Sequence, residues 1–140
     1  MMRNEDITII DFEIEEIKPA KIVVNIKDEE VIIKLYLMPI AVIANKDKTS
    51  FSPISQGFIV VNSNEPRWGE TCSQENIVSH KSVKVENVSF EKRGVTKLLV
   101  ENKIIEISPK VTNLNIYPDL RDDLGNPCVR ISWIQLTTVK

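Results

Sequence analysis

Hydrophobic and polar residues alternate along much of this chain, which is the pattern of strands that bury one face. Ile7 and Ile9, and then Ile10, Phe12 and Ile14, follow a period of two with one change of phase. Such a change is typical of a bulge or of a change in which face is buried. Similar patterns predict further strands over residues 21–26, 31–44, 57–63, 82–90, 95–108, 110–118 and 128–139.

Turn residues divide these predicted strands. Residues 45–56 are predicted to form a polar loop, and residues 121–127 (RDDLGNP) a turn. Residues 95–108 also show helical spacing, but Glu101 and Asn102 lie between two apolar runs rich in β-branched residues. Because Asn tolerates a positive φ, we favour a tight hairpin over these two residues. Pro39 is expected at an edge or bend, since proline cannot donate to a ladder.

The segment from Ser63 to His80 shows little β character. Thr71 is followed by Gln74, the spacing of a capping box that begins a helix. We therefore predict at most one short helix, near residues 73–79.

Composition supports a chain that is mostly β. Ile and Val supply 35 of the 140 residues, whereas Ala supplies three and Ala, Leu and Met together supply 14. We predict an all-β fold in a single domain over residues 1–140, as a β-barrel or a two-sheet sandwich of about eight to ten strands. Residues 21–62 and 97–138 show a similar order of strands, prolines and glycines, which is a weak sign of internal duplication or of chance.

Charge is distributed unevenly along the chain. Residues 1–30 carry a net charge of −5 and the remaining residues +3, for a total of −2. The acidic segment either is solvated or pairs with the basic one, within the chain or between copies. The sequence has no apolar run long enough for a membrane span and no secretory signal pattern, so we expect a cytoplasmic protein with no membrane partner. Cys72 and Cys128 are then expected to be free thiols, unless the fold brings them together.

Residues with catalytic chemistry are few. Cys72 with His80 is the sole Cys–His combination, and it lacks a recognisable nucleophile motif. Asp119, Asp122 and Asp123 are close in sequence, but they fit a turn better than a cation loop. We expect no cofactor, no metal and a non-enzymatic role. A small enzyme that uses Cys72 and His80, or the Asp119–Asp123 carboxylates, is a lesser alternative.

Binding residues are expected in the loops of a β scaffold. Trp68 lies between Arg67 and Gly69, outside any predicted strand, so it either plugs one end of the fold or is presented to a partner. Arg and Trp are enriched in binding hot spots. The candidate binding residues are Arg67, Trp68, Glu70 and Phe51.

The resulting hypothesis is an interaction or structural module that associates with itself or with a protein partner, because long Ile/Val edges need a partner or a cover. A homo-oligomer is expected. The alternative is a β-barrel that binds single-stranded nucleic acid through Arg67 and Trp68. Lys34 with Tyr36, and Arg130 near Trp133, also combine a basic residue with an aromatic one. The net charge does not favour nucleic acid.

Overall fold

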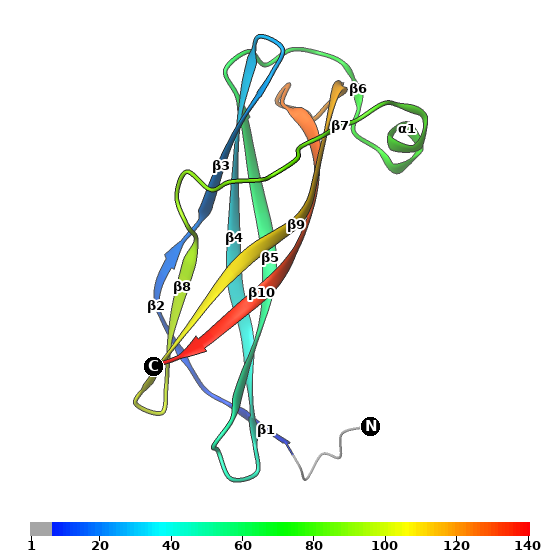
Figure 1. Ribbon diagram of the computed structural model, residues 1–140. Coiled ribbons are helices and arrows are strands. Elements are labelled where there is room, and N and C mark those ends of the chain that lie inside the picture. The colour runs from blue at the N-terminus through cyan, green and yellow to red at the C-terminus, as the bar shows by residue number, and fades with distance from the viewer. Residues whose placement is uncertain (1–6) are drawn as a thin grey trace.

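The computed structural model describes residues 7–140 and contains two antiparallel sheets and one short helix (Figure 1). The two sheets are not closed into a barrel, so the sandwich is the correct form of the predicted all-β fold. The elements are β1 (Ile7–Ile10), β2 (Glu13–Lys18), β3 (Ala20–Ile26), β4 (Glu29–Asn45), β5 (Phe51–Ser63), β6 (Glu70–Thr71), α1 (Gln74–Ser79), β7 (Val83–Lys84), β8 (Val95–Val100), β9 (Lys103–Arg121) and β10 (Pro127–Val139).

A long central strand organises each sheet. In the first sheet, β4 pairs with β3 and β1 along one side and with β5 along the other. In the second sheet, β9 pairs with β8, β7 and β6 along one side and with β10 along the other. β2 extends this sheet beyond β8. The chain crosses between the two sheets three times within the described residues: between β1 and β2, at Pro19 between β2 and β3, and between β5 and β6.

Pro39 lies within β4, a central strand, where a missing N–H would normally cost a ladder bond. β3 pairs with residues 29–35 of β4, and β1 pairs with residues 42–45. Pro39 lies between these two partners, where no strand is paired on that side. The bulge between Pro39 and Ala41 bends the strand at the same point, as the sequence predicts.

The units β3–β4–β5 and β8–β9–β10 share a topology: a short strand, a long central strand and a second long strand. Pro109 of β9, like Pro39 of β4, lies just beyond the pairing with the short strand. The hairpin between β8 and β9 turns over Glu101 and Asn102, both with positive φ, which confirms that prediction. Whether the two units arose by duplication stays a prediction.

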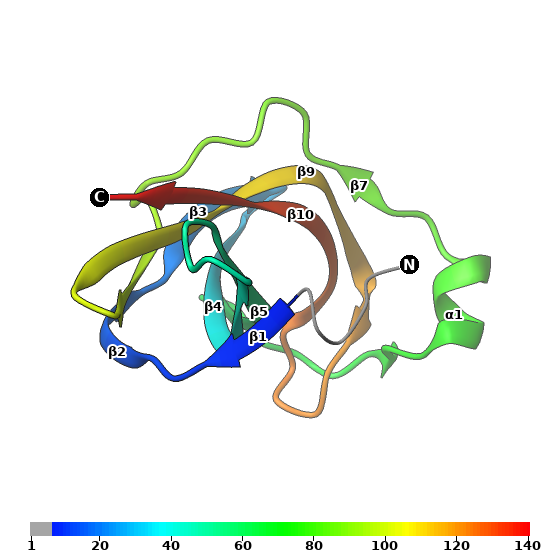
Figure 2. The same cartoon turned by 90° about the horizontal axis from the view of Figure 1, so that it is seen from below.

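The core lies between the sheets. One cluster of buried side chains is centred on Val42, Leu98 and Ile105, and a second on Ile33, Leu114 and Ile116. A smaller cluster of Tyr117, Leu120 and Cys128 lies at one end and is covered by Ile77 of α1. α1 itself lies outside the two sheets (Figure 2). Within residues 7–140, no helix has the length and apolarity that crossing a bilayer requires.

α1 occupies the predicted span, but its cap differs from the prediction. Ser73, not Thr71, is the N-cap residue, and its hydroxyl accepts a hydrogen bond from the N–H of Asn76. Thr71 belongs instead to the short strand β6, which pairs with the end of β9. The helix therefore begins two residues later than the capping-box pattern indicates.

Cys72 and Cys128 form a disulfide, with Cα atoms 5.6 Å apart. The expectation of free thiols is therefore wrong. The fold brings the two residues together because Cys72 follows β6 and Cys128 is the second residue of β10, and both strands lie beside β9. The disulfide ties the segment that carries Trp68 and α1 to the second sheet.

Candidate functional site

The open side of the sandwich lies between β5 and β10. No backbone hydrogen bond joins these two strands within residues 7–140. Side chains bridge them instead: Gln135 Nε2 donates to the Pro53 carbonyl over 3.0 Å, and Ser55 contacts Gln135 Oε1. At the other end, Asn126 Oδ1 accepts from the Ser63 N–H over 2.8 Å. We call the region between β5 and β10 the open seam.

The backbone of β5 leaves polar groups unpaired at the open seam. The N–H of Asn64 donates to the Glu30 carbonyl of β4, whereas the N–H of Ser63 points the other way, toward Asn126. Because N–H groups of an extended strand alternate in direction, the odd-numbered residues of β5 direct theirs away from β4. Between the two bridged ends, the N–H groups of Gly57, Ile59 and Val61 therefore face the seam without a strand partner.

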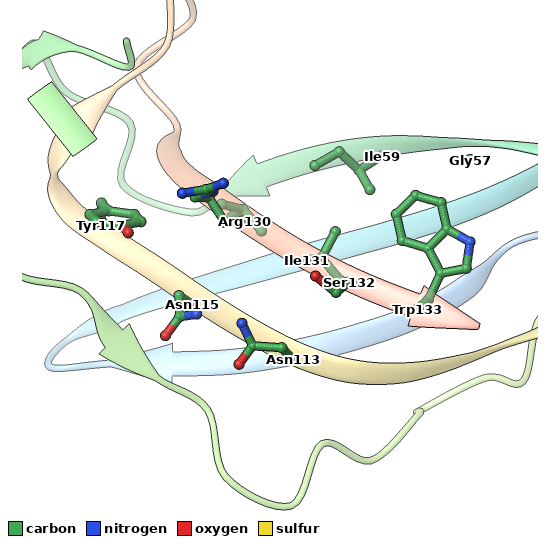
Figure 3. Close-up of a pocket in the computed structure, with 10 residues that line it drawn as sticks. Gly57, Ile59, Asn113, Asn115, Tyr117, Arg130, Ile131, Ser132 and Trp133 are labelled. Atoms are coloured by element: carbon green, nitrogen blue, oxygen red, sulfur yellow. The ribbon is translucent and has the colours of Figure 1, made fainter. Parts of the chain in front are cut away.

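A groove of about 540 Å³ opens at this seam (Figure 3). On β9 and β10, Asn115 lies directly opposite Arg130 and Asn113 opposite Ser132, which gives a polar floor. None of the side chains of Asn113, Asn115 and Arg130 makes a hydrogen bond or ion pair with another described residue. The residues lining the groove are Gly57, Ile59, Asn113, Asn115, Tyr117, Val129, Arg130, Ile131, Ser132 and Trp133.

Gly57 and Trp133 fix how closely the two strands approach. A Cβ atom placed on Gly57 would lie 2.1 Å from Cζ2 of Trp133, so only glycine leaves space for the indole. Trp133 in turn packs against the core cluster between the sheets. The indole therefore fills the seam beside Gly57, and the groove begins next to the indole.

The seam strands are apolar and nearly free of charge. β5 has no charged residue in its 13 positions, and β10 has Arg130 alone. Edge strands in soluble proteins usually carry charges that prevent further pairing. Seven of the fourteen large hydrophobic side chains that are exposed within residues 7–140 lie on these two strands: Ile54, Phe58, Ile59, Val60, Ile134, Leu136 and Val139.

The N–H of Arg67 donates to the Gly125 carbonyl over 3.0 Å, which sets Arg67 beside the turn of residues 122–126. This turn lies at the end of the sandwich where β5 ends (Figure 1). Trp68 is 88% exposed and Leu124, in that turn, is 80% exposed, and both line a hollow of about 260 Å³. Arg67 donates to the Pro118 carbonyl over 3.1 Å and lies 3.8 Å from Glu29. Trp68 is thus presented at the surface, while the guanidinium beside it already contacts protein groups.

The other two candidates are placed differently. Glu70 pairs with His80 at 2.7 Å, across the loop that holds α1. Phe51 is buried and begins β5, although residues 45–56 were predicted to be a loop. Its ring lies 5.2 Å from Nζ of Lys103 and packs in the core. Phe51 therefore lies in a strand and packs in the core, not in the predicted loop, and its role in binding stays a prediction.

The residues considered for catalysis have structural partners. The sulfur of Cys72 is bonded to Cys128, so it is not a free thiol beside His80. The ring of His80 contacts the Asn76 carbonyl over 2.8 Å. The carboxylate of Asp122 accepts from the N–H groups of Leu124 and Asn126, as expected of the predicted turn.

A buried ion pair supports the end of the sandwich that carries Trp68. The guanidinium of Arg121 donates to both carboxylate oxygens of Glu29, over 2.6 and 2.8 Å. It also donates to the carbonyls of Pro118 and Gly125. The hydrogen bonds that Arg121 donates to the Glu29 carboxylate hold the pKa of that carboxyl below its ordinary value. The pair links β4 to the last residue of β9 and fixes the turn that follows.

The polar floor of the groove was not identified from the sequence. A signal was present, because Asn113 and Asn115, and Arg130 and Ser132, alternate with apolar residues. Each pair is typical of the solvated face of a strand. Only the register of β9 with β10 shows that the four residues meet.

Comparison with known proteins assigns no family: no protein-family model, no curated protein and no solved structure matches the chain.

Proposed function

We propose that this chain is a non-enzymatic interaction module that associates with a second copy of itself through the open seam. The observation that carries the proposal is a 13-residue edge strand, β5, that has no charged residue and leaves alternate backbone groups unpaired. Such an edge is a template for pairing with another strand. The exposed hydrophobic side chains on β5 and β10 supply apolar area to bury.

A second copy is the occupant that the charge pattern favours. Where β5 of one copy lies beside β10 of the other, Arg130 is the sole charge on either strand, so no two like charges are set opposite each other. Each molecule also carries both unpaired edges, β5 and β10. A two-fold arrangement that sets β5 of one copy beside β10 of the other satisfies both edges at once.

Introducing a lysine at the open seam is expected to dissociate the dimer into monomers. Light scattering during size-exclusion chromatography should give twice the chain mass of 16.0 kDa for the wild type.

Ile59→Lys and Leu136→Lys should each give the monomer mass at the same concentration. An unpaired charge in the interface is expected to weaken association at least about a hundred-fold. Circular dichroism should stay unchanged, because both side chains are already partly exposed.

Leu124→Lys is the matched control, because Leu124 is exposed but lies in the turn near Trp68, away from the seam. It should leave the mass at the dimer value. A monomeric wild type would contradict self-association. If both seam variants stay dimeric and Leu124→Lys is monomeric, the interface lies at the end of the sandwich that carries Trp68 instead.

The compartment belongs to the same proposal. A cytoplasmic location was expected from the sequence, but a disulfide is typical of oxidising compartments, with intracellular proteins of hyperthermophiles as an exception. Free thiols can be trapped with iodoacetamide in intact source cells, and mass spectrometry of Cys72 and Cys128 then distinguishes the cytoplasm from an oxidising compartment. Unmodified, linked cysteines support an oxidising setting, and alkylated cysteines support the cytoplasm.

A further inference from the structure

A second surface, on the outer face of the first sheet, gathers positive charge. A cleft of about 340 Å³ lies at the corner where β2 passes into β3. The cleft itself lies on β2, β3, β4 and the loop before β8, and no residue of β5 or β10 lines it. Its lining residues are Lys18, Pro19, Lys21, Lys34, Lys92 and Arg93. We call these residues the basic cleft.

The fold assembles this charge from three separate segments. Lys21 of β3 and Lys34 of β4 lie directly opposite each other, an arrangement of like charges that costs stability. The loop before β8 then adds two more cations, because the N–H of Lys21 donates to the Lys92 carbonyl over 2.9 Å. Gly94 permits this approach: a Cβ there would lie 2.4 Å from the Ala20 nitrogen.

The positive charge of the basic cleft is only partly neutralised. Lys18 pairs with Glu16 at 2.8 Å, and Lys21 with Glu91 at 3.2 Å. The remaining cations, Lys34, Lys92 and Arg93, form no ion pair with another residue of the described chain. Five cations and two carboxylates leave a local charge of +3, in a protein whose net charge is −2. This contrast indicates a site for an anion.

Two aromatic rings continue the surface beyond the cations. Tyr36 follows Lys34 by two residues, so both side chains lie on the outer face of β4. Phe58 of β5 is directly opposite Tyr36 and is 49% exposed. A row of cations is thus followed along the sheet by a pair of aromatic side chains. Uncharged bases stack on aromatic rings, whereas phosphates need the cations.

From this arrangement we propose that the basic cleft, together with Tyr36 and Phe58, binds single-stranded nucleic acid. The phosphates contact Lys34, Lys92 and Arg93, and bases stack on the two rings. The site expected from the sequence, at Arg67 and Trp68, fits this ligand less well, because Arg67 lies 3.8 Å from Glu29 and Asp123 lines the hollow beside Trp68. Sulfated polysaccharide and phosphorylated lipid share the anion chemistry, and the test below distinguishes them from a nucleic acid.

The test is the fluorescence anisotropy of a labelled oligothymidylate of about twelve nucleotides, titrated with the full chain at several salt concentrations. Binding should weaken with salt along a log–log slope of about −2, as expected for about three neutralised phosphates on a single strand. The Lys34→Ala/Lys92→Ala double variant should flatten that slope to about −0.7, the value for one remaining phosphate contact. Phe58→Ala should weaken binding by roughly five-fold or more without changing the slope.

A Lys46→Ala/Lys110→Ala double variant is the control, since it removes the same charge from exposed positions outside the basic cleft. It should keep the wild-type affinity and slope. No binding at low salt, or equal loss in both double variants, would overturn the proposal. Binding of heparin or of vesicles containing a phosphoinositide, with no binding of the oligonucleotide, would overturn it too and assign the anion to another source.

Discussion

Replacing Arg121 with methionine is expected to lower the free energy of unfolding by about 3–5 kcal/mol. The substitution leaves the carboxylate of Glu29 buried without its bidentate partner, and it removes the hydrogen bonds to the carbonyls of Pro118 and Gly125. Both side chains are nearly inaccessible to solvent, so water cannot replace the lost contacts. Urea unfolding at pH 7, followed by circular dichroism, measures the loss.

The Glu29→Met/Arg121→Met double variant is the control. Removing both charges abolishes the need for pairing, so it should regain much of the stability lost in the single variant. A double variant that is much less stable than Arg121→Met would mean that the pair itself, and not the unpaired charge, determines the effect. A loss below about 1 kcal/mol in the single variant would show that the pair is exposed to water.

The same pair makes stability depend on pH. Hydrogen bonds from Arg121 depress the pKa of Glu29 in the folded protein. Its contribution is therefore complete above the unfolded-state pKa of about 4.3, and it is lost as pH falls through the lower folded-state pKa. The wild type should lose this stability in acid, below about pH 4, while the Glu29→Met/Arg121→Met variant should lack that component.

Removing the disulfide is the second large expected effect. A link across 56 residues restricts the unfolded chain, and the chain-entropy relation gives about 4 kcal/mol. The Cys72→Ser/Cys128→Ser variant should be destabilised by about that amount in urea unfolding. The reduced wild type should behave in the same way. The loss should concern the global transition, because the disulfide joins the segment around α1 to the second sheet.

Dithiothreitol provides the control for this prediction. It should lower the stability of the wild type and leave the serine variant unchanged. Oxidised and reduced wild-type protein of equal stability would contradict the link between Cys72 and Cys128 as a stabilising element. Global stability kept, with faster proteolysis near Trp68 alone, would limit its effect to that segment.

Local chemistry explains which parts of the fold the sequence predicted. The Ile- and Val-rich alternation predicted an all-β chain because strand periodicity needs no knowledge of distant residues. The hairpin at Glu101 and Asn102 was predicted because turn geometry depends on adjacent residues. Phe51 was missed because polar neighbours on both sides resemble a loop, whereas its burial depends on pairing with Ala44 of β4.

Features that depend on contacts distant in sequence were not predicted. The disulfide requires β6 and β10 to lie on opposite sides of β9, which no spacing reveals. The basic cleft requires Lys21 to face Lys34, and the loop of Lys92 to dock on β3. The exposure of Trp68 fits one of the two sequence-based alternatives, presentation at the surface, because the residue lies outside any alternating strand pattern. The open seam, by contrast, depends on two strands that fail to pair.

Amide hydrogen exchange tests most directly whether two copies pair at the open seam. The exchange rate of each residue is measured by NMR in a dilute and in a concentrated sample of the protein. The N–H groups of Gly57, Ile59 and Val61 should exchange fast when dilute and become protected when concentrated, because only a partner strand supplies their acceptors. Those of Phe58 and Val60, which face β4, should be protected in both samples. Identical exchange of the first three at both concentrations, in a sample whose mass doubles, would contradict pairing at the seam.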